Sequence, residues 1–331
     1  MATGQPSLVY LQNSGLGNIV NPIISLATPS IYGLPMLLLI GWRGEPGKPD
    51  EPQHRVQGPA TPSLLGEKIL FIKTLNTICI FLAALGIPFQ SLPNNHDDAG
   101  QALETAKHYM KTAKGPYALL VKRETFLPYT LPKIDVDVEI RLPLTREQAL
   151  ECVMNHFQQQ DIVVSTTEML SRELFELRTK RHDGHERDFL TVGGMGHASS
   201  IVLVYCLDGD GAVLMHMGIL ANNAAATPSN FKHIVFNNGA HDSVGDQPTV
   251  AGNHEKFSFC HIAQGCGYKH VMIATNQFEI NEAMEKIRAI NSDGPILLEL
   301  RIQTGHRKNL GRPTRSTDEN RKDFMHFLQL N

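Results

Sequence analysis

Short, uninterrupted apolar runs alternate along this chain with segments whose apolar residues recur at helical spacing. A strand that is apolar at every position cannot leave one face in water, so it is typical of a parallel sheet covered by helices on both faces. The strand-like runs are residues 7–11, 34–40, 116–122, 161–165, 201–207, 233–236, 270–274 and 296–302. The pattern predicts an α/β protein built on parallel sheets.

Residues 131–143 interrupt this alternation, because two prolines flank a polar–apolar alternating segment that suits an edge strand or a linker. A chain of 331 residues is long enough for about two domains. We therefore expect a first domain at residues 1–133, a linker at 134–144 and a second domain at 145–331. The tail beyond Gln303 is basic and polar, and we expect it to be a surface extension.

Composition excludes several classes of partner. The formal net charge of -3 gives no indication of nucleic acid or an anionic membrane surface. The five cysteines contain no CxxC pair, which favours reduced thiols in a cytoplasmic protein over a zinc site. The N-terminus lacks a signal-peptide pattern. The most apolar stretch, 69–89, contains Lys73, Asn76 and Pro88, so it favours a buried helix over a membrane span.

Two short polar motifs follow strand-like runs that are one crossover apart. Asp210 lies between Gly209 and Gly211, and Asn238 follows the next strand. One carboxylate and one amide oxygen can hold Mg²⁺, with a backbone carbonyl near Ala240 and diphosphate oxygens completing the shell. Either motif alone is a common turn. Together they indicate a site for a metal ion and a diphosphate.

The glycines of the first motif let a phosphate approach the backbone, and the helix expected from about Ala212 would direct its first amides at the anion. Upstream, Gly193, Gly194 and Gly196 surround Met195 after a short strand-like run. Such glycines can contact a flat ring, and a flexible methionine can wedge beneath it. The plainer alternative is a glycine-rich turn with a core methionine.

With these motifs in place, the chain resembles the phosphonopyruvate decarboxylase family of thiamine diphosphate enzymes, with the sulfopyruvate decarboxylases next. The resembling segments are residues 6–18, 36–58, 184–200, 207–218 and 237–245. The resemblance implies two doubly wound parallel-sheet domains, the first binding the pyrimidine and incomplete at its N-terminus, the second binding diphosphate and Mg²⁺. It also implies active sites between domains of different subunits, and hence a homo-oligomer.

The resemblance implies roles for particular residues. Asp210 and Asn238 would bind Mg²⁺, with Asn237 left open as an alternative to its neighbour. The carbonyl of Gly193 would accept a hydrogen bond from the aminopyrimidine, and Met195 would hold the cofactor in its bent conformation.

The implied reaction is non-oxidative decarboxylation of a small anionic 2-oxo acid, phosphonopyruvate giving phosphonoacetaldehyde, with sulfopyruvate as the alternative substrate. The cofactor carries the chemistry and the protein orients it. Such a substrate needs cations or hydrogen-bond donors, and an arginine can donate two parallel hydrogen bonds to a phosphonate. The candidates are Arg43, His54, His197 and His241, each of which could also be an ordinary loop residue.

The chain departs from the family pattern in four places. It begins at a point matching the middle of the family's first domain, beyond a glutamate that assists the cofactor, so a catalytically silent cofactor-binding homologue is an alternative. About ten residues are missing between His197 and Leu207, and 66–81 resembles an insertion. Glu168 and Leu170 stand where glycine and threonine are expected near the diphosphate.

Overall fold

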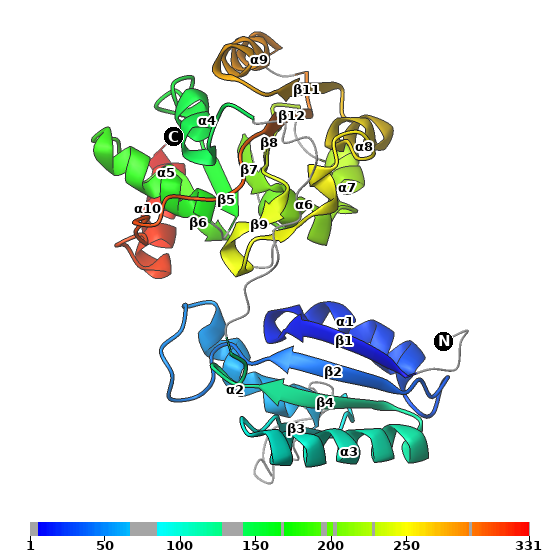
Figure 1. Cartoon of the computed structure of the whole chain (residues 1–331). Coiled ribbons are helices and arrows are strands. Elements are labelled where there is room, and N and C mark those ends of the chain that lie inside the picture. Colours follow the sequence, from blue (N-terminus) through cyan, green and yellow to red (C-terminus); the bar gives the residue numbers. More distant parts are fainter. Residues whose placement is uncertain are drawn as a thin grey trace. The chain divides into compact units, whose positions relative to one another are not determined.

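The protein is described from a computed structural model of the whole chain (Figure 1). The structure describes residues 6–66, 85–127, 142–166, 169–192, 197–200, 204–226, 229–290 and 293–330. The chain forms two units, Met1–Ile134 and Asp135–Asn331, and each contains its own parallel sheet. Among the described helices, none has the length and hydropathy that crossing a membrane requires.

The first unit is a four-stranded parallel sheet with the strand order β1-β2-β4-β3. Its strands are β1 (Ser7–Gln12), β2 (Met36–Gly41), β3 (Phe89–Ser91) and β4 (Pro116–Val121). Its helices are α1 (Leu16–Pro22), a π-helical turn (Ile23–Ala27), α2 (His54–Leu65) and α3 (His96–Ala113).

Strand β2 shows why its sequence is apolar throughout. Leu38 and Ile40 pack into a cluster with apolar residues of α1 and α2, whereas Leu37 and Leu39 pack against a second cluster that includes one face of α3. Successive side chains of a strand point to opposite faces of the sheet. Both faces of β2 are therefore covered, as the uninterrupted apolar run predicts.

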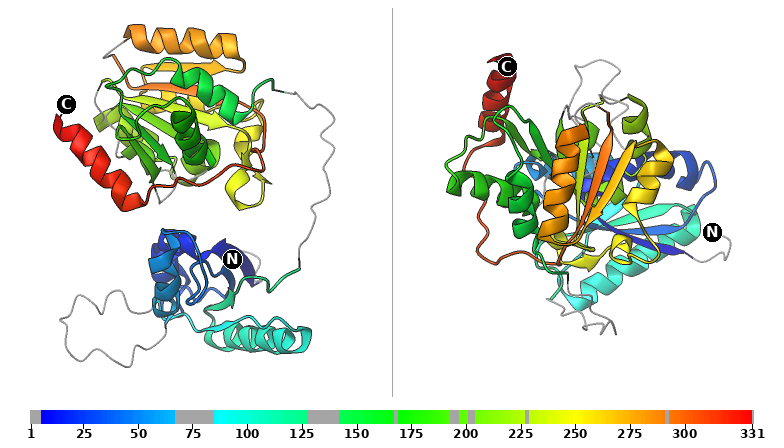
Figure 2. Two further views of the ribbon diagram at one scale, coloured as in Figure 1. Left: turned by 90° about the vertical axis from the view of Figure 1, so that its left-hand side faces the viewer. Right: turned by 90° about the horizontal axis from the view of Figure 1, so that it is seen from above.

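The second unit is a six-stranded parallel sheet with the order β11-β12-β8-β7-β5-β6 (Figures 1 and 2). Its strands are β5 (Val163–Thr166), β6 (Asp188–Val192), β7 (Tyr205–Gly209), β8 (Lys232–Asn237), β11 (His270–Ala274) and β12 (Ile296–Arg301). Two short strands, β9 (Ala240–His241) and β10 (Gln247–Pro248), form a separate antiparallel pair. Its helices are α4 (Arg146–Met154), α5 (Met169–Lys180), α6 (Asp210–Met215), α7 (Ile219–Ala226), α8 (Phe259–Cys266), α9 (Gln277–Ile290) and α10 (Thr317–Leu330).

The central strand β8 is covered on both faces in the same way. Ile234 and Phe236 pack into a cluster with apolar residues of α4, α5 and α9, and Val235 packs into another with residues of α7 and α8. The predicted α/β class with parallel sheets is thus confirmed in both units.

Helix α10 differs from the sequence-based expectation. The prediction that the C-terminal tail is a surface extension was wrong for this helix, because its Phe324 is 9% exposed and its ring centroid lies 5.2 Å from that of a phenylalanine of β6. The buried Asn320 donates a hydrogen bond to the carbonyl of Asp188 at 2.8 Å and accepts one from the amide of Leu190 at 3.0 Å. Helix α10 therefore satisfies polar backbone groups of the edge strand β6, which would otherwise be open to pairing with another chain.

Some predicted boundaries shift. Helix α6 begins at Asp210 rather than near Ala212. The apolar stretch 69–89 was expected to be a helix, but its described end is not helical and β3 begins at Phe89. Residues 67–84, which include most of the expected insertion, and the expected edge segment 134–140 lie outside the described residues.

The expected deletion before β7 leaves the sheet continuous, because β7 pairs with β5 on one side and β8 on the other. Leu170 packs fully buried in the core of the second unit, and Glu168 lies outside the described residues. The leucine therefore serves the packing of α5 and is not a surface group.

Candidate functional site

The carboxyl ends of β7 and β8 lie side by side in the second sheet. Gly209, the last residue of β7, pairs with Phe236 of β8, so Asp210 and Asn238 follow neighbouring strands at one edge (Figure 1). In open α/β sheets ligands bind at the carboxyl ends of the strands. Two polar motifs separated in the sequence by α6, α7 and β8 therefore lie at the same end of the sheet.

Asp210 is a buried carboxylate. It is 1% exposed, and its Oδ2 accepts a hydrogen bond of 2.5 Å from the hydroxyl of Thr249. Burial raises the pKa of Asp210 to about 6, although this hydrogen bond, backbone amides and nearby His241 oppose the shift. With the described residues it forms no ion pair. Buried charges in proteins are paired or bind metal ions, so this carboxylate suits a cation.

Asn238 is held by a second carboxylate. Its Nδ2 donates to Oδ2 of Asp242 at 2.7 Å, and its Oδ1 accepts from the amide of Ala240 at 3.2 Å. The side-chain orientation follows from chemistry, because a carboxylate can only accept and must face the amide nitrogen. An amide oxygen has two lone pairs, so Oδ1 of Asn238 can still bind a cation.

The sequence did not point to the residues that hold Asp242. Arg146, at the start of α4, donates to Asp242 from Nη1 at 2.8 Å and to Glu173 of α5 from Nε at 2.8 Å. Burial lowers the pKa of Arg146, but the two carboxylates outweigh burial and raise it above its ordinary value. Their spacing in the sequence does not predict this contact, because the three side chains come from α4, α5 and the turn after β9. Buried and paired, they hold the turn that carries Asn238.

Asn237 lies on different partners. Its Nδ2 donates to Oε1 of Glu299 at 2.9 Å and to the carbonyl of Ala251 at 3.0 Å, and its Oδ1 accepts from the amide of Gly239. Its side chain thus ties β8 to β12. The amide oxygens of Asn237 and Asn238 each accept one backbone amide, so these contacts do not separate the two asparagines as ligands.

His241 packs against the glycine that follows Asp210. A Cβ placed on Gly211 would lie 2.4 Å from Nδ1 of His241, so only a glycine allows the ring to lie there. Gly209, the N-cap of α6, adopts an extended conformation without a side-chain cap. The structure therefore brings His241, Gly211 and Asp210 together.

The other candidates are placed separately. His197 is exposed, and its ring centroid lies 4.2 Å from that of His216. Gly193 and Met195 lie outside the described residues. Arg43 and His54 belong to the first unit, where His54 is 7% exposed with its Nδ1 3.1 Å from Oε1 of Gln57.

Arg43 does not extend freely into solvent. Its Nε lies 3.0 Å from Oδ2 of Asp50, and its Nη2 lies 2.5 Å from Oδ1. The hydrogen bonds from Arg43 hold the pKa of Asp50 well below its usual range. Arg43 therefore forms an ion pair within its own loop.

The donor set at the second sheet edge fits Mg²⁺. It offers the carboxylate of Asp210, the amide oxygen of Asn238 and the backbone carbonyl of Ala240 at the start of β9, all of them oxygen ligands. Magnesium is bound in proteins by one or two carboxylates and by substrate phosphates.

Comparison with known proteins defines the class to which this fold and site belong. Residues 190–300, which include both Asp210 and Asn238, match the family model described as "Thiamine pyrophosphate enzyme, C-terminal TPP binding domain". The matched segment lies within the second unit.

Relatives identify the family. The chain is 32% identical to a phosphonopyruvate decarboxylase of Streptomyces viridochromogenes over 96% of this chain and 78% of that protein. It is 31% identical to that of Streptomyces hygroscopicus, over 96% of this chain and 77% of that protein. A sulfopyruvate decarboxylase subunit beta of Methanocaldococcus jannaschii is 31% identical over 37% of this chain and 66% of that protein. The chain belongs to the phosphonopyruvate decarboxylase family, and with it to the carboxy-lyases.

Proposed function

We propose that this chain uses thiamine diphosphate and Mg²⁺ to decarboxylate 3-phosphonopyruvate to phosphonoacetaldehyde and CO₂. The observation that carries the proposal is the buried carboxylate of Asp210, which has no ion pair among the described residues and shares a sheet edge with Asn238. This edge lies within the segment that matches a thiamine pyrophosphate-binding domain. The choice of substrate is supported by the relatives that are similar over 96% of the chain.

In this proposal Asp210, Oδ1 of Asn238 and the carbonyl of Ala240 hold Mg²⁺, which anchors the diphosphate. The bound cofactor supplies the electron sink for the loss of CO₂. The carboxylate of Asp242 keeps the amide oxygen of Asn238 turned to the ion. His241, held against the backbone beside Asp210, is a hydrogen-bond donor for the substrate.

Further assignments in the proposal rest on the family. Residues 1–133 act as the pyrimidine-binding domain and 145–331 as the diphosphate-binding domain, with a homo-oligomer completing the active sites. Gly193 and Met195 contact the pyrimidine and the bend of the cofactor, and His197, Arg43 and His54 lie among the groups near the substrate. Light scattering on the purified chain tests the oligomer, and a monomer that turns over contradicts it.

The metal assignment is tested by titrating the chain with thiamine diphosphate in the presence and absence of Mg²⁺. Asp210→Asn keeps the size of the side chain but removes its charge. Since loss of a group that only supports a metal ligand costs about 10–100-fold in affinity, loss of a direct ligand is expected to cost at least about a hundredfold. Asp246→Asn is the matched control, because Asp246 is exposed in the loop between β9 and β10, at a φ of 57° that asparagine tolerates.

The reaction is tested by measuring CO₂ release from 3-phosphonopyruvate and from sulfopyruvate. Faster turnover of phosphonopyruvate supports the proposal. Faster turnover of sulfopyruvate supports the second candidate substrate, which the sulfopyruvate decarboxylase relatives favour. Cofactor binding with neither activity contradicts the proposal and supports a silent homologue.

A further inference from the structure

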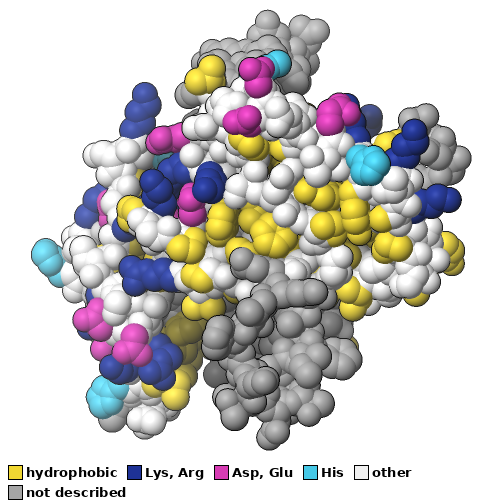
Figure 3. Space-filling model, turned by 90° about the horizontal axis from the view of Figure 1, so that it is seen from below, with side chains coloured by type: hydrophobic (Ala, Val, Ile, Leu, Met, Phe, Trp, Pro, Cys, Tyr) yellow, Lys and Arg dark blue, Asp and Glu magenta, His cyan; other side chains and the backbone are white. Residues whose placement is uncertain are grey.

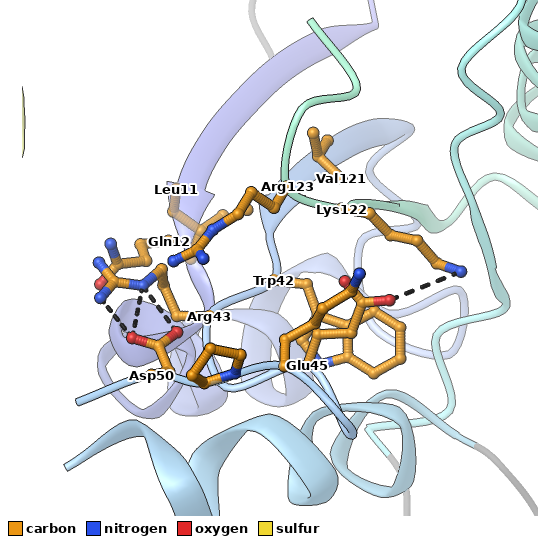
Figure 4. Close-up of a pocket in the computed structure, with 12 residues that line it drawn as sticks. Leu11, Gln12, Trp42, Arg43, Glu45, Asp50, Val121, Lys122 and Arg123 are labelled. Atoms are coloured by element: carbon orange, nitrogen blue, oxygen red, sulfur yellow. Dashed lines mark hydrogen bonds and ion pairs between the residues drawn. The ribbon is translucent and has the colours of Figure 1, made fainter. Parts of the chain in front are cut away.

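A pocket in the first unit lies at the carboxyl ends of its parallel strands (Figure 4). Gln12 ends β1, Trp42 directly follows β2 and Val121 ends β4, and all three line the pocket. Its volume of about 300 Å³ is at the lower end of the range for sites that bind small molecules. The pocket is complete within this unit.

Basic side chains outnumber acidic ones around this pocket. Two of the basic groups are compensated: Arg43 is paired with Asp50 at 2.5 Å, and Lys122 lies 3.7 Å from Glu45. The two acidic residues of the lining are used in these pairs.

Two further basic residues, Lys48 and Arg123, line the same pocket and form no ion pair within the described part of the chain. Both are exposed, so neither is held by burial. Two positive charges are therefore left uncompensated at the pocket.

Arg123 is placed to reach into the pocket rather than away from it. It follows β4 by two residues, in a turn where the amide and the hydroxyl of Thr125 donate to the carbonyl of Lys122 at 3.3 and 2.9 Å. Figure 4 shows its side chain extending toward the side of the pocket where Gln12 and Arg43 lie. Because Asp50 neutralises Arg43, a second guanidinium can approach that side without strong repulsion.

We propose that this pocket binds the phosphonate of the substrate, with Arg123 as its principal ligand and Lys48 as a second cation. This inference rests on the proposed function at one point, because that function identifies the molecule that carries the phosphonate. A tetrahedral oxyanion accepts two parallel hydrogen bonds from a guanidinium. Two uncompensated positive charges match a phosphonate, which carries between one and two negative charges at neutral pH, better than a sulfonate, which carries one. The pocket therefore selects phosphonopyruvate over sulfopyruvate.

The binding test uses the full chain and two probes that need no cofactor, methylphosphonate and methanesulfonate. In ³¹P NMR or calorimetric titrations, wild type is expected to bind methylphosphonate saturably and more tightly than methanesulfonate. Arg123→Ala is expected to weaken methylphosphonate binding at least tenfold, and Arg123→Lys less. Arg55→Ala, which removes an exposed arginine of α2 outside the pocket, is the control and should bind as wild type does.

Turnover separates this inference from the proposed function. With thiamine diphosphate and Mg²⁺, Arg123→Ala should raise KM for 3-phosphonopyruvate at least tenfold, whereas Arg55→Ala should leave it unchanged. If the chain decarboxylates but Arg123→Ala behaves as wild type, the pocket assignment is overturned while the function stands. If the chain does not turn over, the methylphosphonate titration still decides the pocket. Absence of saturable methylphosphonate binding, or equal binding by wild type and Arg123→Ala, overturns it.

Discussion

Replacing Asn13 by alanine should destabilise the loop that forms the phosphonate pocket. The side chain of Asn13 is 4% exposed and makes three hydrogen bonds. Its Nδ2 donates to the carbonyl of Arg43 at 2.8 Å and to the hydroxyl of Thr61 at 2.9 Å, and its Oδ1 accepts from the amide of Arg43 at 3.1 Å. One side chain thus fixes the loop after β2 to helix α2.

The magnitude follows from these contacts. Each intramolecular hydrogen bond contributes about 1 kcal/mol net, and each buried group left without a partner costs a similar amount or more. Three bonds therefore correspond to a loss of about 3 kcal/mol in the free energy of unfolding. In a unit of this size the midpoint of thermal unfolding should fall by about 10 °C.

The single tryptophan supplies the assay. Trp42 lies directly before Arg43 and donates from Nε1 to the carbonyl of Gly58 at 2.9 Å, so its fluorescence reports on this loop. Asn21→Ala is the control, because Asn21 is exposed on α1. If Asn13→Ala unfolds within about 2 °C of wild type, the three hydrogen bonds do not contribute as argued.

Three other changes test the architecture. Asp188→Asn leaves Arg178 buried beside a neutral group instead of a carboxylate that accepts two bonds of 2.9 Å, so chemical denaturation should show a loss of about 3–5 kcal/mol; a loss below about 1 kcal/mol contradicts this. Asp50→Asn removes a carboxylate whose pKa is lowered by Arg43. Because the pKa of Asp50 is lower in the folded than in the unfolded protein, its carboxylate stabilises the fold above the unfolded-state pKa of about 4, and this stabilisation is lost as the pH falls further. The difference in unfolding free energy between wild type and Asp50→Asn should therefore be full at pH 7 and shrink below about pH 4. A difference that is independent of pH refutes the pairing. Gly58→Ala places a Cβ 1.6 Å from a backbone oxygen, so the variant should unfold at a lower temperature by circular dichroism, at a cost above about 4 kcal/mol; an unchanged midpoint refutes the close approach.

Most of the fold could be predicted from local patterns. Apolar runs marked β2, β4 and β8 as strands with two covered faces, because the alternation of side chains across a sheet leaves no other way to bury them. The motifs around Asp210 and Asn238 were also local, since each follows a strand directly. Helix α10 was missed because its contacts with β6 depend on a few side chains in a polar segment.

The partners of the functional side chains were decided by the tertiary structure alone. The sequence pointed to Asn238 with its neighbour Asn237 as an alternative, and only the structure shows that the side chain of Asn237 contacts Glu299 and that of Asn238 contacts Asp242. It also offered Arg43 as one of four candidate substrate groups, and only the structure shows that Asp50 compensates the charge of Arg43 whereas Arg123, in the proposed pocket, has no such partner among the described residues. Hydrophobic periodicity predicts which face of a helix or strand is buried, but it does not predict which charged side chains from distant parts of the sequence will pair. The sequence by itself therefore determined which strands are buried on both faces. The choice of ion-pair partners was decided by the packing of elements that are far apart in the chain.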